Sequence, residues 1–154
     1  MNTISADAQN LLAESKTPFI HNGIRYISFI QYLSHQKALW FGDIRVADQV
    51  MRVSAPMKQR QLGNKVQGYV AAAWAPVCGN VIFEGLKSKF LQHPALSRWL
   101  LDRSDAELMR VECACGISCG VDYGCRSGVS KTSCNPLDEA LVRVRELLKM
   151  RRAA

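Results

Sequence analysis

The chain has 154 residues, of which 48% are hydrophobic and 21% charged, a composition that suits one globular domain with a core of its own. Its formal net charge of +7 and sequence pI of about 9.3 favour anionic ligands such as nucleotides, sugar phosphates or nucleic acid. No apolar run approaches the roughly 20 residues that span a bilayer, and the first residues lack a basic stretch followed by an apolar one, so we expect a cytoplasmic protein with no membrane partner.

The first segments are expected to form a short helix followed by a hairpin. Residues 5–15 begin with a good capping residue, Ser5, and are followed by Pro18, which ends a helix before it. Residues 19–21 and 24–27 are predicted to be two short strands, because the Asn-Gly pair between them is typical of a two-residue hairpin turn.

Residues 28–43 are predicted to form the helix around which the chain is organised. Ser28 is a good N-cap residue, and Gly42 stands where a left-handed residue commonly ends a helix. With 3.6 residues per turn, Lys37 lies on the same mostly apolar face as Ile30. The usual interpretation of such a lysine is that its methylenes cover apolar surface while its ammonium stays in water. The alternative is a partly desolvated amine that attacks a carbonyl and forms a Schiff base.

The remainder of the chain predicts further helices. Asp43 is placed to cap a helix over 44–53 with Ile44 on its inner face, and Ser54 to cap a helix that ends at Gly63. The other expected elements are a helix over 69–74 up to an interruption at Pro76, helices over 80–92 and 95–102, a strand over 108–112, and a closing helix over 136–150. We therefore expect a single α+β domain over residues 1–154, mainly helical with a small β-sheet.

The six cysteines are expected to be reduced thiols, metal ligands or core residues rather than disulfides, because no export signal is evident. Five of them lie between Cys113 and Cys134. Their Cys-x-Cys start matches the ligand spacing of structural zinc sites poorly, and small thiols pack well in a glycine-rich turn region. We expect packing, with no metal and no cofactor, and keep zinc binding and a redox role as alternatives.

Short segments along the chain match the motifs of one known family in order and spacing. They are Gln31-Tyr32, Gln36-Lys37-Ala38, Phe41-Gly42-Asp43, Ser54-Ala55-Pro56, Leu62-Gly63-Asn64-Lys65-Val66, Trp74, Glu84-Gly85, Lys89-Phe90, Gln92-His93, Leu100-Leu101, Val111-Glu112 and Val144-Arg145-Glu146. Over residues 23–148 the chain resembles the NADAR (YbiA-like) family, which implies one NADAR-like domain with residues 1–18 contributing a short N-terminal helix.

The resemblance implies an N-glycosidase that cleaves the bond between C1 of a ribose and a nitrogen. Family substrates include ribosylamino phosphates and ADP-ribose attached to guanine. Such a bond breaks through an oxocarbenium-like transition state, so the site needs a carboxylate and a proton donor for the departing nitrogen. A lysine can instead trap C1 of an opened ribose as a Schiff base. By resemblance, Lys37 is the catalytic amine and Gln36 its positioning neighbour.

The chain departs from the family pattern at the expected pocket. Seven residues before Lys37 the family has a glutamate on the same helix face, and this chain has Ile30. The replacement costs about 10²- to 10⁴-fold in rate if no other acid takes over. The candidate replacements are four carboxylates, each of which is individually more typical of a solvated or ion-paired residue: Glu14, Glu84, Glu112 and Asp122.

Asp122 is the third catalytic candidate, because it approximates an aspartate of the family in a segment where the family's tryptophan is absent. The expected substrate-binding residues are drawn from the same motifs and from the one tryptophan that we expect to border a pocket: Tyr32, Trp40, Glu84, Glu112 and Gly120. Trp40, Trp74 and Trp99 all fall at helical core spacing and are expected to be packing residues.

Three functions are compatible with these features. The first is an N-glycosidase with a recruited acid, and Lys37 favours it. The second is an inactive relative, such as a phage or mobile element can encode, that binds nucleotide or ADP-ribose without cleaving it. The third is reuse of the fold for protein or nucleic-acid contacts. Ile30 favours the second and third.

Overall fold

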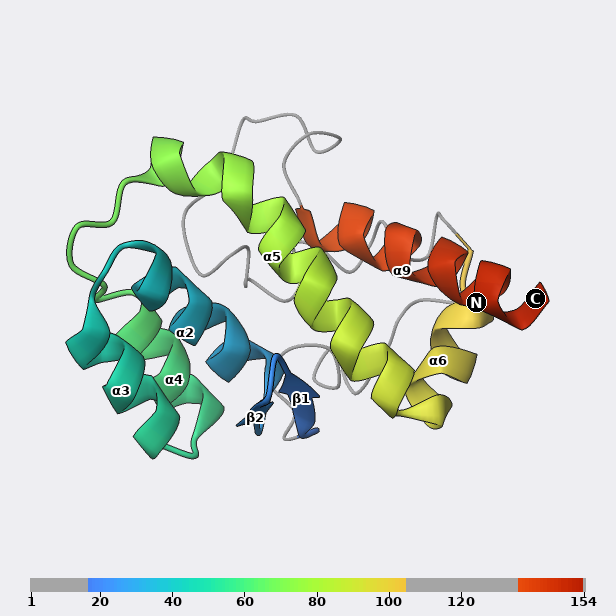
Figure 1. Ribbon diagram of the computed structural model, residues 1–154, viewed down its shortest axis with the longest axis horizontal. Coiled ribbons are helices and arrows are strands. Elements are labelled where there is room, and N and C mark those ends of the chain that lie inside the picture. The colour runs from blue at the N-terminus through green and yellow to red at the C-terminus, as the bar shows by residue number, and fades with distance from the viewer. Residues whose placement is uncertain (1–16, 105–135, 154) are drawn as a thin grey trace.

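A computed structural model describes residues 17–104 and 136–153, and this part of the chain is mainly helical with one small sheet (Figure 1). Its elements are β1 (Phe19–His21), β2 (Ile24–Tyr26), α2 (Phe29–Trp40), α3 (Ile44–Arg52), α4 (Pro56–Gly63), α5 (Ala71–Gln92), α6 (Pro94–Leu101) and α9 (Pro136–Ala153). The predicted fold class is confirmed. The helix expected over 5–15 and the strand expected over 108–112 lie outside the described residues.

The predicted hairpin is present, and the end of α5 holds it in place. β1 and β2 pair antiparallel with Phe19 opposite Tyr26, and the two turn residues both have positive φ, as a two-residue hairpin turn of this type requires. The Gln92 side chain accepts the N–H of Ile20 (2.8 Å) and donates to its carbonyl (2.7 Å), so it pairs with the free edge of β1.

The caps of α2 are those that its sequence predicts. The Ser28 hydroxyl accepts the N–H of Gln31 (3.1 Å), and Gly42 has φ +76° just beyond the helix. The same hydroxyl donates to Gln59 of α4 (2.6 Å), whose amide in turn donates to the carbonyl of Val53 (2.8 Å). The N-terminus of α2 is therefore joined to α4 by a buried polar network.

Ser28→Ala is expected to destabilise the protein by about 1–3 kcal/mol, because the change removes a helix cap and leaves the buried Gln59 carbonyl oxygen without its donor. Urea unfolding followed by circular dichroism measures the effect. Ser54→Ala is the matched control: the sequence predicted a cap there, but α4 begins at Pro56 with Ala55 as its N-cap residue and no side-chain cap, and Ser54 is exposed. Equal losses for the two variants would contradict the network.

Two predictions about the helices are wrong. Ile44 is 57% exposed because it is the first residue of α3 and lies at the end of the helix, whereas Val46, Ala47 and Val50 form the buried face. Pro76 does not interrupt a helix, since α5 is continuous over 22 residues. The proline lies in the second turn, where the carbonyl of Ala72 that loses its partner is on an exposed residue, and Figure 1 shows α5 bending near its start.

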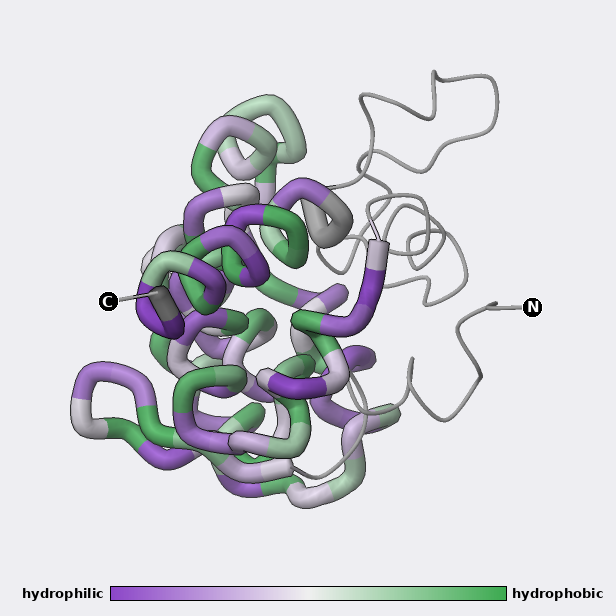
Figure 2. The backbone as a smooth tube through the Cα atoms, turned by 90° about the vertical axis from the view of Figure 1, so that its right-hand side faces the viewer, coloured by the Kyte–Doolittle hydropathy of each residue, from purple (hydrophilic) through white to green (hydrophobic). Residues whose placement is uncertain are grey.

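The core lies where α5 crosses α2 on one side and α9 on the other (Figure 1). Its largest buried side chains are Phe19, Tyr26, Phe29, Tyr32, Trp74 and Phe90. Green and purple segments alternate along the helices in Figure 2, as expected for helices with one buried face. Cys78 of α5 is buried and disulfide-bonded, which contradicts the expectation of reduced thiols; its partner lies outside the described residues.

Gly85 of α5 lies directly against the ring of Tyr32 on α2. A Cβ at this position would lie 2.2 Å from the ring of Tyr32, which cannot move away easily because its hydroxyl donates to the carbonyl of Val81 (2.6 Å). We expect Gly85→Ala to destabilise the protein by about 1–3 kcal/mol through overpacking. Thermal and urea unfolding test this, with Asn80→Ala on an exposed position of the same helix as the control. A Gly85→Ala protein as stable as the control would show that the helices can separate at little cost.

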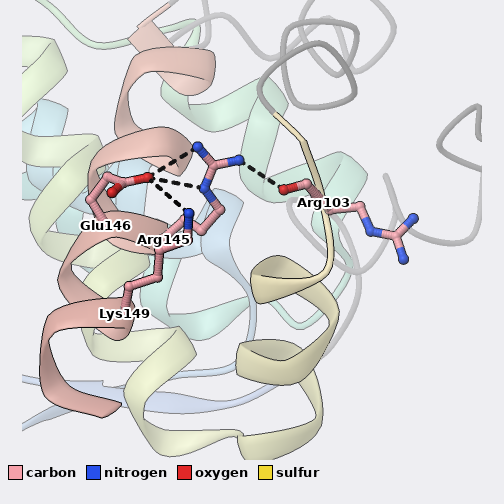
Figure 3. A network of polar contacts seen from close by, with 4 residues as sticks. All are labelled: Arg103, Arg145, Glu146 and Lys149. Carbon is pink, nitrogen blue, oxygen red and sulfur yellow. Dashed lines mark hydrogen bonds and ion pairs between the residues drawn. The ribbon is translucent and has the colours of Figure 1, made fainter. Parts of the chain in front are cut away.

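Arg145 connects α9 to the end of the segment that follows α6 (Figure 3). Its buried guanidinium donates to the carbonyl of Arg103 (2.8 Å) and to the carboxylate of Glu146 (3.1 and 3.3 Å). Lys149 donates to the same carboxylate at 3.5 Å. A buried arginine thus keeps its charge compensated while it fixes the position of the chain at residue 103.

Candidate active site

Lys37 lies in the last turn of α2, and its side chain is only 3% exposed. Its Nζ lies 4.7 Å from the centre of the Tyr69 ring, a distance suited to a cation–π contact. The prediction that the ammonium of Lys37 stays in water is therefore wrong. The geometry fits the alternative, an amine removed from water.

The aromatic wall behind the Lys37 amine consists of three rings, Tyr69, Phe41 and Trp74. The ring centres of Phe41 and Tyr69 are 5.4 Å apart, and those of Phe41 and Trp74 are 6.1 Å apart. Trp74 is completely buried, as a packing residue should be, but its indole nitrogen has no hydrogen-bond partner among the described residues. Sequence analysis did not predict Tyr69 as a site residue. The available signal was an aromatic residue two positions before the start of α5.

Asp43 explains how the ring of Tyr69 comes to lie over the amine. Its carboxylate accepts the N–H of Val46 at the start of α3 and the N–H of Gln67 (2.8 Å) in the loop that leads to Tyr69. These two backbone donors hold the pKa of the Asp43 carboxyl below its usual range. One carboxylate therefore caps α3 and fixes the loop, in which Gly68 has φ +82°.

A shallow depression of about 380 Å³ lies beside this aromatic wall. It is lined by the end of α2, the start of α3 and the same loop, with these residues: Phe41, Gly42, Asp43, Arg45, Gln67 and Gly68. Phe41 thus lines the depression and also packs against Tyr69, whose ring contacts the amine of Lys37.

Gln36, the predicted positioning group, is held by the hairpin. Its amide donates to the hydroxyl of Tyr26 (3.1 Å), which also bonds Nδ1 of His35 at 2.9 Å. Burial lowers the pKa of His35 and raises that of Tyr26. Both groups therefore favour their neutral forms near pH 7, and a neutral hydrogen-bonded cluster fixes the residue next to Lys37.

The described candidates for substrate binding do not gather around Lys37. Tyr32 is buried in the core with its hydroxyl bonded to α5. Trp40 is 54% exposed and lines neither of the two described depressions, so the expectation that it packs at the core is wrong. Glu84 is paired with Lys87 at 3.2 Å, the ordinary ion pair that was the simpler interpretation of this residue.

Ile30 is completely buried in the core, so the position of the family glutamate is occupied by an apolar packing residue. The other acids considered as replacements, Glu14, Glu112 and Asp122, lie outside the described residues, as does Gly120. The cysteines from Cys113 onward lie outside them too. Among the residues that the structure describes, no three metal-binding side chains come together.

A second buried lysine, Lys89, lies on α5. Its side chain is fully buried, and burial lowers its pKa from the ordinary 10.5 to about 7. Sequence analysis quoted Lys89 within a family motif but assigned it no role. Its place on the same helix face as Gly85, which faces Tyr32, was the available signal.

The described residues thus define a mainly helical α+β domain in which a central helix presents a buried lysine to an aromatic wall. Comparison of the sequence with known families then identifies it: the NADAR domain matches residues 3–149, and the chain belongs to this family. The predicted resemblance is confirmed.

Part of the chain is similar to a viral protein. A protein of Acanthamoeba polyphaga mimivirus named N-glycosidase R617 is 31% identical over 84 residues, which make up 54% of this chain and 49% of the viral protein. The similarity therefore spans about half the length of that relative. Within the described part of the chain, none of the helices is long and apolar enough to cross a membrane.

Proposed function

We propose that this protein is an N-glycosidase that cleaves a ribose C1–N bond, with Lys37 as the catalytic amine. The observation that carries the proposal is the amine of a family-motif lysine, removed from water and placed 4.7 Å from the centre of an aromatic ring. Membership of the NADAR family and the name of the viral relative support the same reaction class.

The proposed reaction uses the amine as a nucleophile. Nζ of Lys37 bonds to C1 of the opened ribose while the C1–N bond to the base breaks, and the departing nitrogen keeps the electron pair and takes a proton. Water then adds to C1, which releases the sugar and returns the amine. Removal from water favours the neutral, nucleophilic form of an amine, whereas the ring face favours its charged form.

The proposed substrates carry an ADP-ribosyl group on a base such as guanine, or are ribosylamino phosphates. Both are anionic, and the net charge of +7 supports their attraction to the protein. Gln36, held by Tyr26, is proposed to position the substrate next to the amine. The proton donor is proposed to be one of the carboxylates Glu14, Glu112 and Asp122.

A second candidate is a relative that binds nucleotide or ADP-ribose without cleaving it. The buried Ile30 favours it, because an apolar core residue can neither steady positive charge nor move a proton.

The test is incubation of the purified protein with DNA carrying ADP-ribosylated guanine and, separately, with a ribosylamino phosphate, while release of the base is followed by chromatography. Borohydride is added in a parallel reaction, where it should reduce a lysine–sugar imine to a stable adduct found by mass spectrometry at Lys37. Base release with an adduct at Lys37 supports the enzyme. If neither substrate is cleaved while ADP-ribose still raises the melting temperature, the protein is the binder.

A further inference from the structure

A groove of about 580 Å³ lies at the end of the molecule formed by α6 and the last turns of α9. It is lined by Leu91, Pro94, Ser97, Arg98, Leu101, Asp102, Arg151 and Arg152. In Figure 1 this end lies across α5 from the group formed by α2, α3 and α4. The groove is therefore separate from the aromatic wall around Lys37.

The charge of the groove is positive and is not balanced from within the described residues. Arg98, Arg151 and Arg152 contribute three guanidinium groups from two helices, and Asp102 contributes the single carboxylate of the lining. In the described part of the chain, none of the three arginines forms an ion pair or a side-chain hydrogen bond, with Asp102 or with any other residue. Their donors are thus available to an external anion.

The lining of the groove is also partly apolar. Leu91, Pro94 and Leu101 line it together with Arg98 of α6 and the two arginines at the end of α9. A ligand that fits such a surface carries several negative charges spaced along it and has apolar or planar groups between them. The phosphates of a nucleic-acid strand, with sugars and bases between them, have this pattern.

We propose that this groove binds the phosphodiester backbone of nucleic acid. Arginine is suited to the task, because its planar group donates two parallel hydrogen bonds to a phosphate. An acidic polypeptide is the competing partner, but the apolar side chains that share the lining with the arginines favour a ligand with sugars and bases between its charges.

The role of the groove in catalysis rests on the proposed function: it would hold the strand whose modified guanine is presented to Lys37, while free nucleotide substrates would not need it. Binding itself is independent of cleavage. The Lys37→Ala protein is therefore expected to bind an unmodified strand as tightly as the wild type, which separates failure of the groove from failure of the enzyme.

The experiment is fluorescence anisotropy with a labelled 20-nucleotide single-stranded DNA, at several salt concentrations between about 50 and 200 mM, the range over which phosphate contacts weaken measurably. The double variant Arg151→Ala/Arg152→Ala is compared with Arg25→Ala/Arg52→Ala, which removes the same charge from exposed arginines of β2 and α3. Arg98→Ala is a second groove variant on a different helix. Circular dichroism melts check that each variant is folded.

We expect the Arg151/Arg152 variant to bind about tenfold more weakly at low salt, with the slope of log affinity against log salt reduced by about 1 to 2, and Arg98→Ala to change both in the same direction. The control pair should stay within about twofold of the wild type. The proposal is overturned if the wild type does not bind, if the control loses as much affinity as the groove variants, or if poly-glutamate of equal length displaces the DNA as well as unlabelled DNA does.

Discussion

Lys37→Ala is expected to reduce base release by roughly 10³-fold or more, because the variant keeps the fold but has no amine to attack C1. Lys37→Arg is expected to lose as much, although it keeps a positive charge that can lie against the ring of Tyr69. A charge that only attracts the substrate would be preserved in the arginine variant, so the pair of variants separates attraction from nucleophilic attack.

The measurement is the single-turnover rate of base release with each variant, together with the amount of adduct trapped by borohydride. Lys58→Ala, an exposed lysine of α4, is the matched control and should stay near the wild-type rate. Release at the wild-type rate by Lys37→Ala would rule out this lysine as the nucleophile. Normal release without any trapped adduct in the wild type would assign the bond cleavage to an acid instead.

The helix α2 could be predicted from sequence because its signals are local. Ser28 and Gly42 act on neighbouring residues, and the hairpin turn before the helix depends on two adjacent residues. The errors arose where tertiary contacts decide. The side chain of Ile44 has an apolar character that predicts burial, but at the first position of α3 it stays 57% exposed. Pro76 lies where the lost hydrogen bond can be replaced by water.

The environment of Lys37 could not be predicted by periodicity alone. The face of α2 is visible in the sequence, yet the ring that covers the amine belongs to Tyr69, 32 positions later, and comes to its place through a carboxylate at Asp43. The family resemblance identified the lysine without explaining its burial. Trp40 shows the reverse case: its helical core spacing suggested packing, but at the last position of α2 it is exposed.

Lys89 was overlooked because a lysine next to an apolar residue usually lies at the border of the buried face of a helix. There its methylenes contact apolar surface while its ammonium stays in water. In the fold it follows Gly85 by one turn on the face that packs against α2, and its side chain has no exposed surface. A charge at that position is costly, and this cost makes the stability of the protein depend on pH.

We expect the unfolding free energy to rise with pH through the titration of Lys89. Its pKa is about 7 in the folded protein and close to the ordinary 10.5 in the unfolded chain. Between these values the unfolded chain binds more protons than the folded protein, so the folded state gains stability as pH increases; below pH 7 both forms are protonated and the full cost of the buried charge is present. From pH 6 to pH 9 this group alone should contribute about 2–3 kcal/mol.

Lys89→Met isolates this contribution, because the thioether side chain fills a similar volume and does not titrate. Urea unfolding of both proteins at pH 6, 7.5 and 9 should show a stability difference that favours methionine most at pH 6 and shrinks by about 2–3 kcal/mol by pH 9. Lys58→Met, at an exposed position, should give a difference that does not change with pH. If the unfolding free energies of the wild type and of Lys89→Met change equally with pH, the amine stays charged in the folded protein throughout this range. A neighbouring group would then compensate its burial, and the pH dependence would originate elsewhere.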